Sequence, residues 1–350
     1  MKERFEKRIQ INPKILTSIA LLDEFRSTWK NTVNLTPQVL HRLQKSVVIT
    51  STGASTRIEG STMTDNAVER FLAGLSQKTP ENRDEEEVAG YADVLAHVFD
   101  NAEKLRLTES LILSFHSLLL QFSTKDILHK GAYKKKENLV IAINEMGEQI
   151  KIFEPTPAWL TKKEMDDMLY WFDQALEEKV FHPLLITANV IFEFLAIHPF
   201  TDGNGRLSRI LTNMLLLQNG YAYIPYVSLE EIVEERKDAY YGALRVTQKK
   251  HKTEDENITP WVEFFLDTLV EQSRRAEGIL EQKDITKLLS VNQNKIFDLF
   301  VGEKIVSVRM IHDIFPDIHE QTIKQVLRKL CALELIEMRG EGRATVYVRR

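Results

Sequence analysis

The residues whose types and spacing are best suited to chemistry fall in one stretch, residues 198–209, His-Pro-Phe-Thr-Asp-Gly-Asn-Gly-Arg-Leu-Ser-Arg. His198 can take up a proton near neutral pH. Arg206 and Arg209 are three residues apart, so on a helix they add positive charge on one face. Asp202 brings a carboxylate to the same region, which makes sense if a divalent cation lies between it and phosphate groups. These residue types together predict phosphoryl or nucleotidyl transfer.

Two helices joined by a tight loop must position these side chains. Residues 183–197 are almost continuously apolar and too long for an ordinary strand, so they predict a buried helix that stops before Pro199. Residues 206–218 have helical apolar spacing and end at an Asn-Gly pair typical of a helix C-terminus. Between them, Gly203-Asn204-Gly205 lets the backbone turn and present several amides to one point. Free amides at a helix start form an anion site suited to phosphate.

The stretch resembles the signature His-x-Phe-x-Asp/Glu-Gly-Asn-Gly-Arg-x-x-Arg of the Fic family, and every specified position matches. The alternative is an ordinary helical hairpin with a Gly-rich turn, but such a turn needs neither His198 nor Asp202. The resemblance implies transfer of AMP from Mg-ATP to a Ser, Thr or Tyr hydroxyl of a target protein, with the chain itself as a further acceptor.

The resemblance also implies a role for each site residue. His198 is expected to be the catalytic base and Asp202 the Mg²⁺ ligand. The implied ATP site consists of Glu59, His198, Gly203, Asn204, Gly205, Arg206, Leu207, Ser208, Arg209, Tyr240 and Tyr241. The two tyrosines lie in a predicted helix over residues 228–246. In Fic proteins such a helix lines the adenine pocket, whereas a purely structural role in the core is the alternative for buried tyrosines.

A second segment, Ser55-x-x-x-Glu59-Gly60, is weak when taken by itself, because Gly60 is typical of a helix end and Glu59 of a surface carboxylate. Beside a complete transfer loop, it resembles the Ser/Thr-x-x-x-Glu-Gly/Asn inhibitory motif that some Fic proteins carry on an N-terminal helix. The resemblance then implies that Glu59 pairs with Arg209 and crowds the γ-phosphate of ATP.

Residues 138–153 contain two β-rich runs around a turn with Gly147, which predicts a hairpin. A structural flap is one interpretation. The other, similar to the flap of the Fic family, is a clamp that docks a segment of the protein target by main-chain pairing. Lys134-Lys135-Lys136, just before the hairpin, is interpreted as a solvated run with no part in ATP binding.

The last residues predict a separate small domain. Three short helices followed by two strands give an order that resembles a winged helix. Residues 285–350 hold eleven Lys and Arg against eight Asp and Glu, a balance of +3. DNA contact and a protein–protein or homodimer role both stay open. The basic residues gather at Lys324, Arg328, Lys329, Arg339, Arg343, Arg349 and Arg350.

Composition limits the class of protein. The 350 residues are 43% hydrophobic and 28% charged, as in ordinary globular proteins, and their net charge of −5 argues against a chain dominated by nucleic-acid binding. A single cysteine, Cys331, excludes a disulfide framework. We expect a cytoplasmic protein with no membrane association, since neither a signal peptide nor an apolar run of membrane-spanning length is visible.

The sequence therefore predicts a mainly α fold: a Fic-type helical core with a small β-hairpin flap, plus a C-terminal winged helix. The expected domains are residues 1–100 with the inhibitory motif, 101–282 as the catalytic core, and 285–350. The expected function is a protein adenylyltransferase autoinhibited by Glu59, with Mg²⁺ as cofactor and ATP as co-substrate. Two alternatives stay open: a hydrolase that removes AMP, with Glu59 positioning water, and a DNA-binding regulator whose Fic domain senses a nucleotide.

Overall fold

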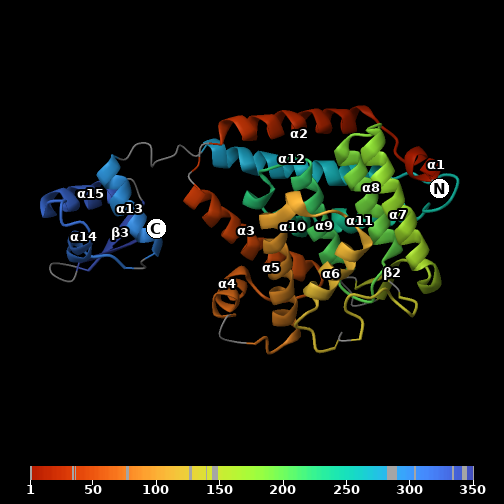
Figure 1. Cartoon of the computed structure of the whole chain (residues 1–350), viewed down its shortest axis with the longest axis horizontal. Coiled ribbons are helices and arrows are strands. Elements are labelled where there is room, and N and C mark those ends of the chain that lie inside the picture. Colours follow the sequence, from red (N-terminus) through yellow and green to blue (C-terminus); the bar gives the residue numbers. More distant parts are fainter. Residues whose placement is uncertain are drawn as a thin grey trace. The chain divides into compact units, whose positions relative to one another are not determined.

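The computed structural model describes the whole chain except residues 1, 34, 36, 76–78, 126–127, 139, 144–148, 282–289, 303–304, 333–334, 341–344 and 350. The chain divides into two compact units, Met1–Leu280 and Glu281–Arg350 (Figure 1). Both are mainly helical, and each of the two short antiparallel sheets has two strands. The predicted fold class, mainly α with a small hairpin, is confirmed.

The larger unit contains the two segments, residues 183–197 and 206–218, that were predicted as helices on either side of the loop with His198 and Asp202. Its elements are α1 Lys2–Lys7, α2 Pro13–Thr32, α3 Pro37–Ile58, α4 Asp65–Gly74, α5 Arg83–Asn101, η1 Ala102–Lys104, α6 Glu109–Leu119, β1 Val140–Ile143, β2 Gln149–Phe153, α7 Ala158–Glu178, α8 Pro183–Ile197, α9 Asn204–Gln218, η2 Ile224–Tyr226, α10 Leu229–Glu235, α11 Lys237–Gln248 and α12 Thr259–Glu281.

Helix α8 packs against both α7 and α9 (Figure 1). Every residue from 184 to 197 is buried, which explains why the helix is apolar on all sides. The side chain of His182 accepts from the N–H of Leu184, and Pro183 occupies the first helical position. The helix that delivers His198 is therefore anchored along its whole length by the core.

The N-terminal helix is attached to α8 by a buried ion network. Arg8 is only 1% exposed and its guanidinium group pairs with Glu193 of α8 and with Glu256. Arg4 pairs with the same two carboxylates, and His251 lies 3.2 Å from Glu193. Glu193, His251 and Glu256 are close enough together to hold a metal ion. Because two arginines already neutralise both carboxylates, we interpret the cluster as a structural ion network.

One predicted helix, residues 228–246, is wrong in its continuity, because the chain forms two helices, α10 and α11, that meet at Arg236. Arg236 has φ −113° and ψ 28°, outside the helical region. The break lets α10 pack on α3 while α11 turns Tyr240 toward Trp261 and Phe264 of α12. Tertiary packing thus overrides a local helical preference.

Helices α5 and α6 approach each other closely at Gly90. A Cβ atom added there would lie 2.0 Å from the carbonyl oxygen of Leu119, which is too close for any side chain. We expect Gly90→Ala to lower the free energy of unfolding by about 1–3 kcal/mol, because α6 must move. Gly278→Ala is the matched control, since Gly278 lies within α12 and a Cβ there meets nothing within 4 Å. Urea unfolding of both variants checks this; equal stability would show that the contact can relax.

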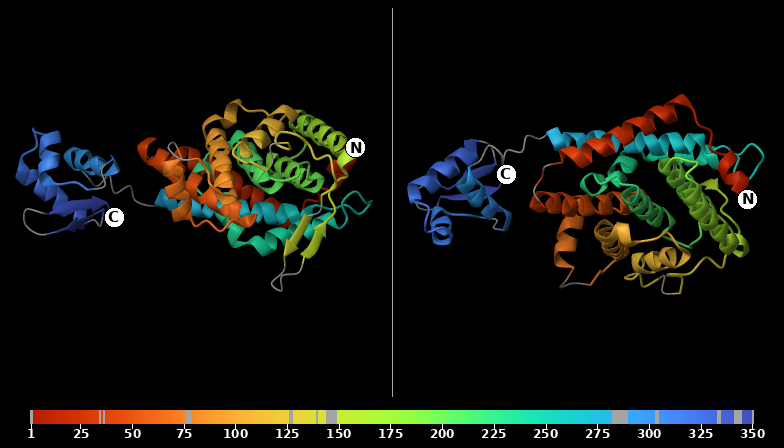
Figure 2. Two further views of the ribbon diagram at one scale, coloured as in Figure 1. Left: turned by 90° about the horizontal axis from the view of Figure 1, so that it is seen from below. Right: turned by 45° about the horizontal axis from the view of Figure 1, so that its top comes forward.

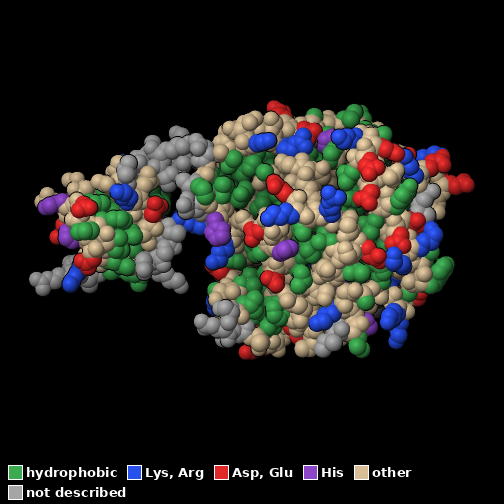
Figure 3. Space-filling model, in the orientation of Figure 1, with side chains coloured by type: hydrophobic (Ala, Val, Ile, Leu, Met, Phe, Trp, Pro, Cys, Tyr) green, Lys and Arg blue, Asp and Glu red, His purple; other side chains and the backbone are tan. Residues whose placement is uncertain are grey.

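The strands β1 and β2 form the predicted hairpin, with Ile143 paired to Gln149 and an irregularity between Val140 and Ile141. Its turn around Gly147 lies outside the described residues. The hairpin stands at the edge of the larger unit (Figure 2). On the face of this unit seen in Figure 3, acidic and basic side chains are intermixed. None of the described helices combines the length and apolar character that a bilayer crossing requires.

The smaller unit has its own core, which includes Ile311, Leu327 and Leu330. Strands β3 and β4 pair antiparallel, and an isolated bridge joins Val306 to Tyr347. Of the predicted basic residues, Arg343 and Arg350 lie outside the described residues. The elements are α13 Val291–Gly302, α14 Val308–Ile314, α15 Glu320–Ala332, β3 Ile336–Arg339 and β4 Val346–Arg349.

Candidate functional site

His198 lies where α8 ends, and its φ of 52° is in the left-handed region that residues other than glycine seldom adopt. Its Nδ1 is 3.4 Å from the carbonyl oxygen of Leu195, so Nδ1 carries the proton and Nε2 is left to accept one. Burial and the nearby charge of Lys134 lower the pKa of His198 to about 4. The imidazole is therefore neutral near pH 7, the form that a general base requires.

The loop after His198 is held by side chains from both sides. Asn204 accepts from the N–H of Phe200 at 2.9 Å and donates to its carbonyl oxygen at 2.8 Å. The ring of Phe200 stacks on His116 of α6, with centroids 3.7 Å apart. The N–H of Gly131 donates to His116 Nδ1, so His116 Nε2 donates to the carbonyl oxygen of Asp202 at 3.0 Å. The backbone of the loop is thus held by hydrogen bonds from Asn204 and His116.

Helix α9 begins at this loop and presents free amides. Gly203 precedes the helix with φ 81°, a conformation that glycine adopts without strain. The first bond of the helix runs from the N–H of Leu207 to the carbonyl oxygen of Gly203 at 2.9 Å. Within the described part of the chain, the N–H groups of Asn204, Gly205 and Arg206 have no acceptor. Three amides and the positive end of the helix dipole form the predicted anion site.

The two arginines of the loop have different partners, although they are three residues apart. Arg206 is 1% exposed, and its guanidinium group pairs with Asp202 at 2.8 Å and with Glu87 of α5 at 3.2 Å. Arg209 faces α3, where its Nε donates to Ser55 Oγ at 2.8 Å and its Nη2 pairs with Glu59 at 2.8 Å. Arg209 Nη1 is buried and has no hydrogen-bond partner among the described residues.

The carboxylate of Glu59 lies directly against the start of α9. A Cβ atom added at Gly205 would be 2.2 Å from Glu59 Oε1 and 3.3 Å from Arg209 Nη1. Gly205 is therefore required for this close approach. Ser55 and Glu59 both contact Arg209, whereas Gly60 ends the segment with φ 107°. The carboxylate of Glu59 therefore lies beside the start of α9.

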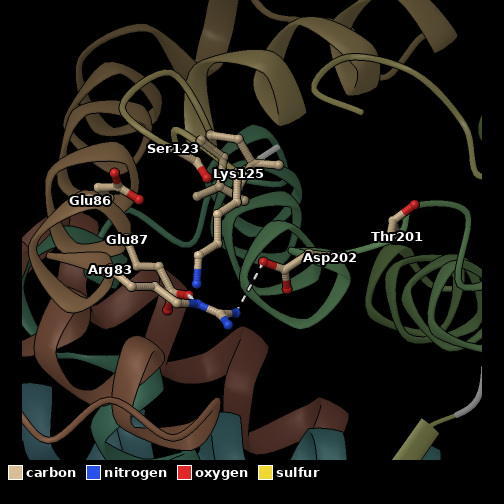
Figure 4. A pocket seen from close by; sticks show the side chains of 9 residues that line it. Arg83, Glu86, Glu87, Ser123, Lys125, Thr201 and Asp202 are labelled. Carbon is tan, nitrogen blue, oxygen red and sulfur yellow. Dashed lines mark hydrogen bonds and ion pairs between the residues drawn. The ribbon is translucent and has the colours of Figure 1, made fainter. Parts of the chain in front are cut away.

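Asp202 is the carboxylate on the other side of the loop. Burial alone would raise its pKa, but Arg206, the N–H of Gly203 and Arg83 together hold the pKa below its usual value. It borders a cavity of about 280 Å³ that Arg83 and Lys125 also line (Figure 4). A single ionised carboxylate beside an anion site is the donor set that Mg²⁺ uses when substrate phosphates supply further ligands. The residues present therefore fit the predicted metal ion.

Two of the residues predicted to bind ATP have side chains that are engaged within the protein. Leu207 is fully buried in the hydrophobic core, and Ser208 Oγ donates to the carbonyl oxygen of Gly205 at 2.7 Å. Successive residues of a helix point in directions 100° apart, so only the main chain of these two residues belongs to the start of α9. A part for these two residues in ATP binding stays a prediction.

The two candidate adenine-stacking residues differ in exposure. Tyr240 is 5% exposed and its ring contacts Tyr241, Trp261 and Phe264. Burial raises the pKa of Tyr240 to about 12, with Arg209 opposing the rise. Tyr241 is half-buried and stands beside it. Tyr240 is therefore engaged as a core residue, and Tyr241 is the better candidate for contact with a base.

Three residues of this region were not found from the sequence. His116 and Glu87 lie on α6 and α5, far from the loop in sequence, and nothing local marks them. Lys134 was interpreted as part of a solvated run, and this is wrong, because Lys134 is 4% exposed while Lys135 and Lys136 are exposed. The only sequence signal for burial was the apolar Tyr133 beside it.

The segment that carries this site is similar to known proteins. Residues 106–216 match the sequence model of the Fic/DOC family. A crystal structure of a Fic family protein from Desulfovibrio desulfuricans superposes with a TM-score of 0.67 at 26% identity, covering 97% of each chain. Residues 106–216 are therefore similar to the Fic/DOC family, and the mainly helical fold matches that of solved Fic structures.

More particularly, curated relatives are named protein adenylyltransferases. A probable protein adenylyltransferase of Aquifex aeolicus is 30% identical over 122 residues, which are 32% of this chain and 35% of that protein. The protein adenylyltransferase Fic of Drosophila mojavensis is 28% identical over 253 residues, 71% of this chain and 45% of that protein. The chain thus spans less than half the length of either relative.

Proposed function

We propose that this chain is a protein adenylyltransferase that moves AMP from ATP to a Ser, Thr or Tyr hydroxyl of a protein. The observation that carries the proposal is His198, whose Nε2 can accept a proton, placed six residues before the start of α9, where three amides have no acceptor among the described residues. A base and an anion site at one point are what transfer of a phosphate-containing group requires. The adenylyltransferase names of the relatives support the same choice.

In the proposed reaction, the acceptor hydroxyl oxygen forms a bond to the α-phosphorus of ATP. The bond from the α-phosphorus to the oxygen that bridges to the β-phosphorus breaks, and pyrophosphate leaves with that electron pair. The hydroxyl proton passes to Nε2 of His198. The amides of Asn204, Gly205 and Arg206 stabilise the phosphate charge, and Arg209 Nη1 is available to the outer phosphates.

We assign Asp202 as the protein ligand of Mg²⁺. The ion, when bound, neutralises phosphate charge and assists departure of pyrophosphate. Arg206 holds the Asp202 carboxylate at 2.8 Å, so its orientation is set before the ion arrives. Arg83 contacts the same carboxylate at 3.5 Å from an exposed position, and this longer contact is the one that can be given up.

We further propose that Glu59 inhibits the reaction. Its carboxylate pairs with Arg209 Nη2 and lies next to Gly205. The phosphate groups of a nucleotide would therefore compete with Glu59 for the positive charge of Arg209 and for the amides at the start of α9. ATP would then bind with its γ-phosphate displaced and its α-phosphate out of line with the hydroxyl. Ser55 holds Nε of Arg209 independently, so release of Glu59 would leave the arginine in position.

The target is proposed to dock on the hairpin. Phe153, the last residue of β2, contacts the His198 ring edge-on with centroids 5.9 Å apart. A segment that pairs with the hairpin by main-chain hydrogen bonds would therefore pass close to the base. In this proposal the hairpin recognises the backbone of the target segment, and His198 accepts the proton of the hydroxyl group that this segment places beside it.

Labelled ATP tests the proposal. The chain is incubated with Mg²⁺ and ATP labelled at either the α- or the γ-phosphate, and protein-bound label is measured. AMP transfer predicts protein label from α-labelled ATP only. Label from γ-labelled ATP would indicate phosphorylation, and absence of label from either, with Glu59→Gly included to remove inhibition, would reject the proposal.

Removal of AMP is the second candidate function. Glu59 is 33% exposed at its side chain and lies beside the anion site, so its carboxylate could also orient a water molecule. An AMP-modified protein supplied as substrate separates the two directions. Release of AMP that is lost in Glu59→Gln would favour hydrolysis. A DNA-binding regulator is the third candidate, and a salt-sensitive gel shift that depends on Lys324 and Arg328 would favour it.

The smaller unit is expected to be dispensable for self-modification. A chain ending at residue 281 retains the loop, Glu59 and the whole larger core, and the smaller unit has a separate core. We expect its rate of self-modification to remain within about twofold of the full chain. Circular dichroism checks folding. A folded but inactive truncation would show that the smaller unit belongs to the catalytic unit.

A further inference from the structure

Lys134 contacts the loop that carries His198, outside the recognised stretch. Its Nζ donates to the carbonyl oxygen of Ile197 at 3.1 Å and to Asn138 Oδ1 at 2.8 Å, and its N–H donates to the carbonyl oxygen of Pro199 at 2.9 Å. Asn138 in turn donates to the carbonyl oxygen of Phe200 at 3.0 Å. Residues 134–138 thus hold the backbone on both sides of His198.

The position of the ammonium group has a physical reason. Ile197 is the last residue of α8, where carbonyl groups lack helical partners and the helix dipole is negative. The next residue, His198, has a left-handed backbone conformation that costs energy and persists only where the surroundings impose it. Hydrogen bonds from Lys134 to the carbonyl groups of Ile197 and Pro199 impose this conformation on His198.

The other neighbours of Lys134 leave its ammonium group to contact the segment around His198. The carboxylate of Glu164 on α7, which faces this region, is already paired with Lys252. Among the described residues, Lys134 Nζ therefore donates to Ile197 and Asn138. Because Lys134 is 4% exposed, its charge is poorly screened by water.

We propose that Lys134 is a positioning residue for His198: it fixes the end of α8 and keeps the imidazole in its neutral, proton-accepting form. The proposal rests on the transfer reaction proposed above. It extends the site to a segment that the signature stretch does not include.

Charge supports this assignment. Burial lowers the pKa of Lys134 to about 8, with Lys252 adding to the effect and Glu137 and Glu164 opposing it, so the group is mostly charged at pH 7. Around His198, burial and Lys134 lower the pKa, while the Leu195 carbonyl, Glu59 and Asp202 raise it. Removal of the Lys134 charge must therefore raise the pKa of His198.

The test compares Lys134→Met, Lys134→Gln and Lys134→Arg with Lys135→Met, which removes a neighbouring but exposed charge. In the full chain, the pKa of His198 is measured by NMR titration, with its signal assigned by its loss in His198→Ala. We expect a higher pKa in the Met and Gln variants and an unchanged pKa in the Arg variant and the Lys135 control.

Kinetics supply the second readout. We expect Lys134→Met to reduce kcat on the order of 10- to 100-fold with little change in the KM for ATP, since misplacement of a base by about 1 Å costs this much. The acid limb of the kcat/KM profile should move to higher pH in Lys134→Met and Lys134→Gln. Rescue by Lys134→Arg should restore the wild-type profile. Lys134→Gln retains a donor to Ile197, so it carries the test if the Met variant does not fold.

An unchanged His198 pKa in folded Lys134→Gln, or equal effects of the Lys134 and Lys135 substitutions, would overturn the proposal. The NMR arm also separates it from the proposed function. If wild type and Glu59→Gly transfer no AMP while the His198 pKa still depends on Lys134, the reaction is wrong and the positioning role stands. If transfer occurs but neither pKa nor kcat responds to Lys134, the positioning role alone is wrong.

Discussion

His198→Ala is expected to reduce AMP transfer by about 10²–10⁴-fold while nucleotide binding survives. In the proposed mechanism Nε2 of the imidazole takes the hydroxyl proton, whereas the amides of α9 and Arg209 bind the phosphate groups. The amides of α9 and Arg209 remain in place, because the loop is held by Asn204 and His116. Initial rates with α-labelled ATP and calorimetric binding of ATP measure the two effects separately.

Two variants control this result. His129→Ala removes an exposed histidine of the same unit and should leave the rate unchanged. Asp202→Ala should behave differently from His198→Ala, because it removes the proposed Mg²⁺ ligand and therefore the metal-dependent part of nucleotide affinity as well. Undiminished transfer by His198→Ala would remove His198 from the mechanism.

Glu59→Gly is expected to raise the rate of self-modification by about 10²-fold. In the structure Glu59 holds Arg209 Nη2 at 2.8 Å and its carboxylate lies over Gly205. Removal of the carboxylate frees Arg209 for the γ-phosphate and removes a negative charge from beside the phosphate site. Helix α3 ends at Ile58, so glycine at position 59 falls outside the helix interior, where its cost would be greatest.

The charge and the size of Glu59 can be tested apart. Glu59→Gln keeps the length of the side chain without its charge. Partial activation would therefore show that both the charge and the size of Glu59 contribute to the inhibition. Glu59→Gly combined with Arg209→Ala should not be activated, because the double variant loses Arg209, the proposed partner of the γ-phosphate, together with the inhibiting carboxylate. If Glu59→Gly is folded, binds ATP and is no faster than wild type, Glu59 does not inhibit transfer, and the hydrolytic role becomes the better account.

The local part of the site follows from the sequence. Pro199 ends α8, Gly203 permits the left-handed turn, and Asn204 begins α9, because each of these residues restricts or frees the backbone at its own position. The apolar run of α8 likewise predicts a helix buried on all sides. Dihedral preferences and apolar patterning act over a few residues, so they can be read along the chain.

Tertiary structure decided which charges meet. The spacing of Arg206 and Arg209 predicts positive charge on one helical face, yet Arg206 pairs with Glu87 of α5 and Arg209 contacts Ser55 of α3, because two different helices pack against α9. The burial of Lys134 and of Tyr240 was decided in the same way, by carbonyl groups of α8 and by aromatic rings of α12. Sequence spacing determines which way a side chain leaves its own helix. The segment that it meets there depends on packing between distant parts of the chain, and no local pattern records that.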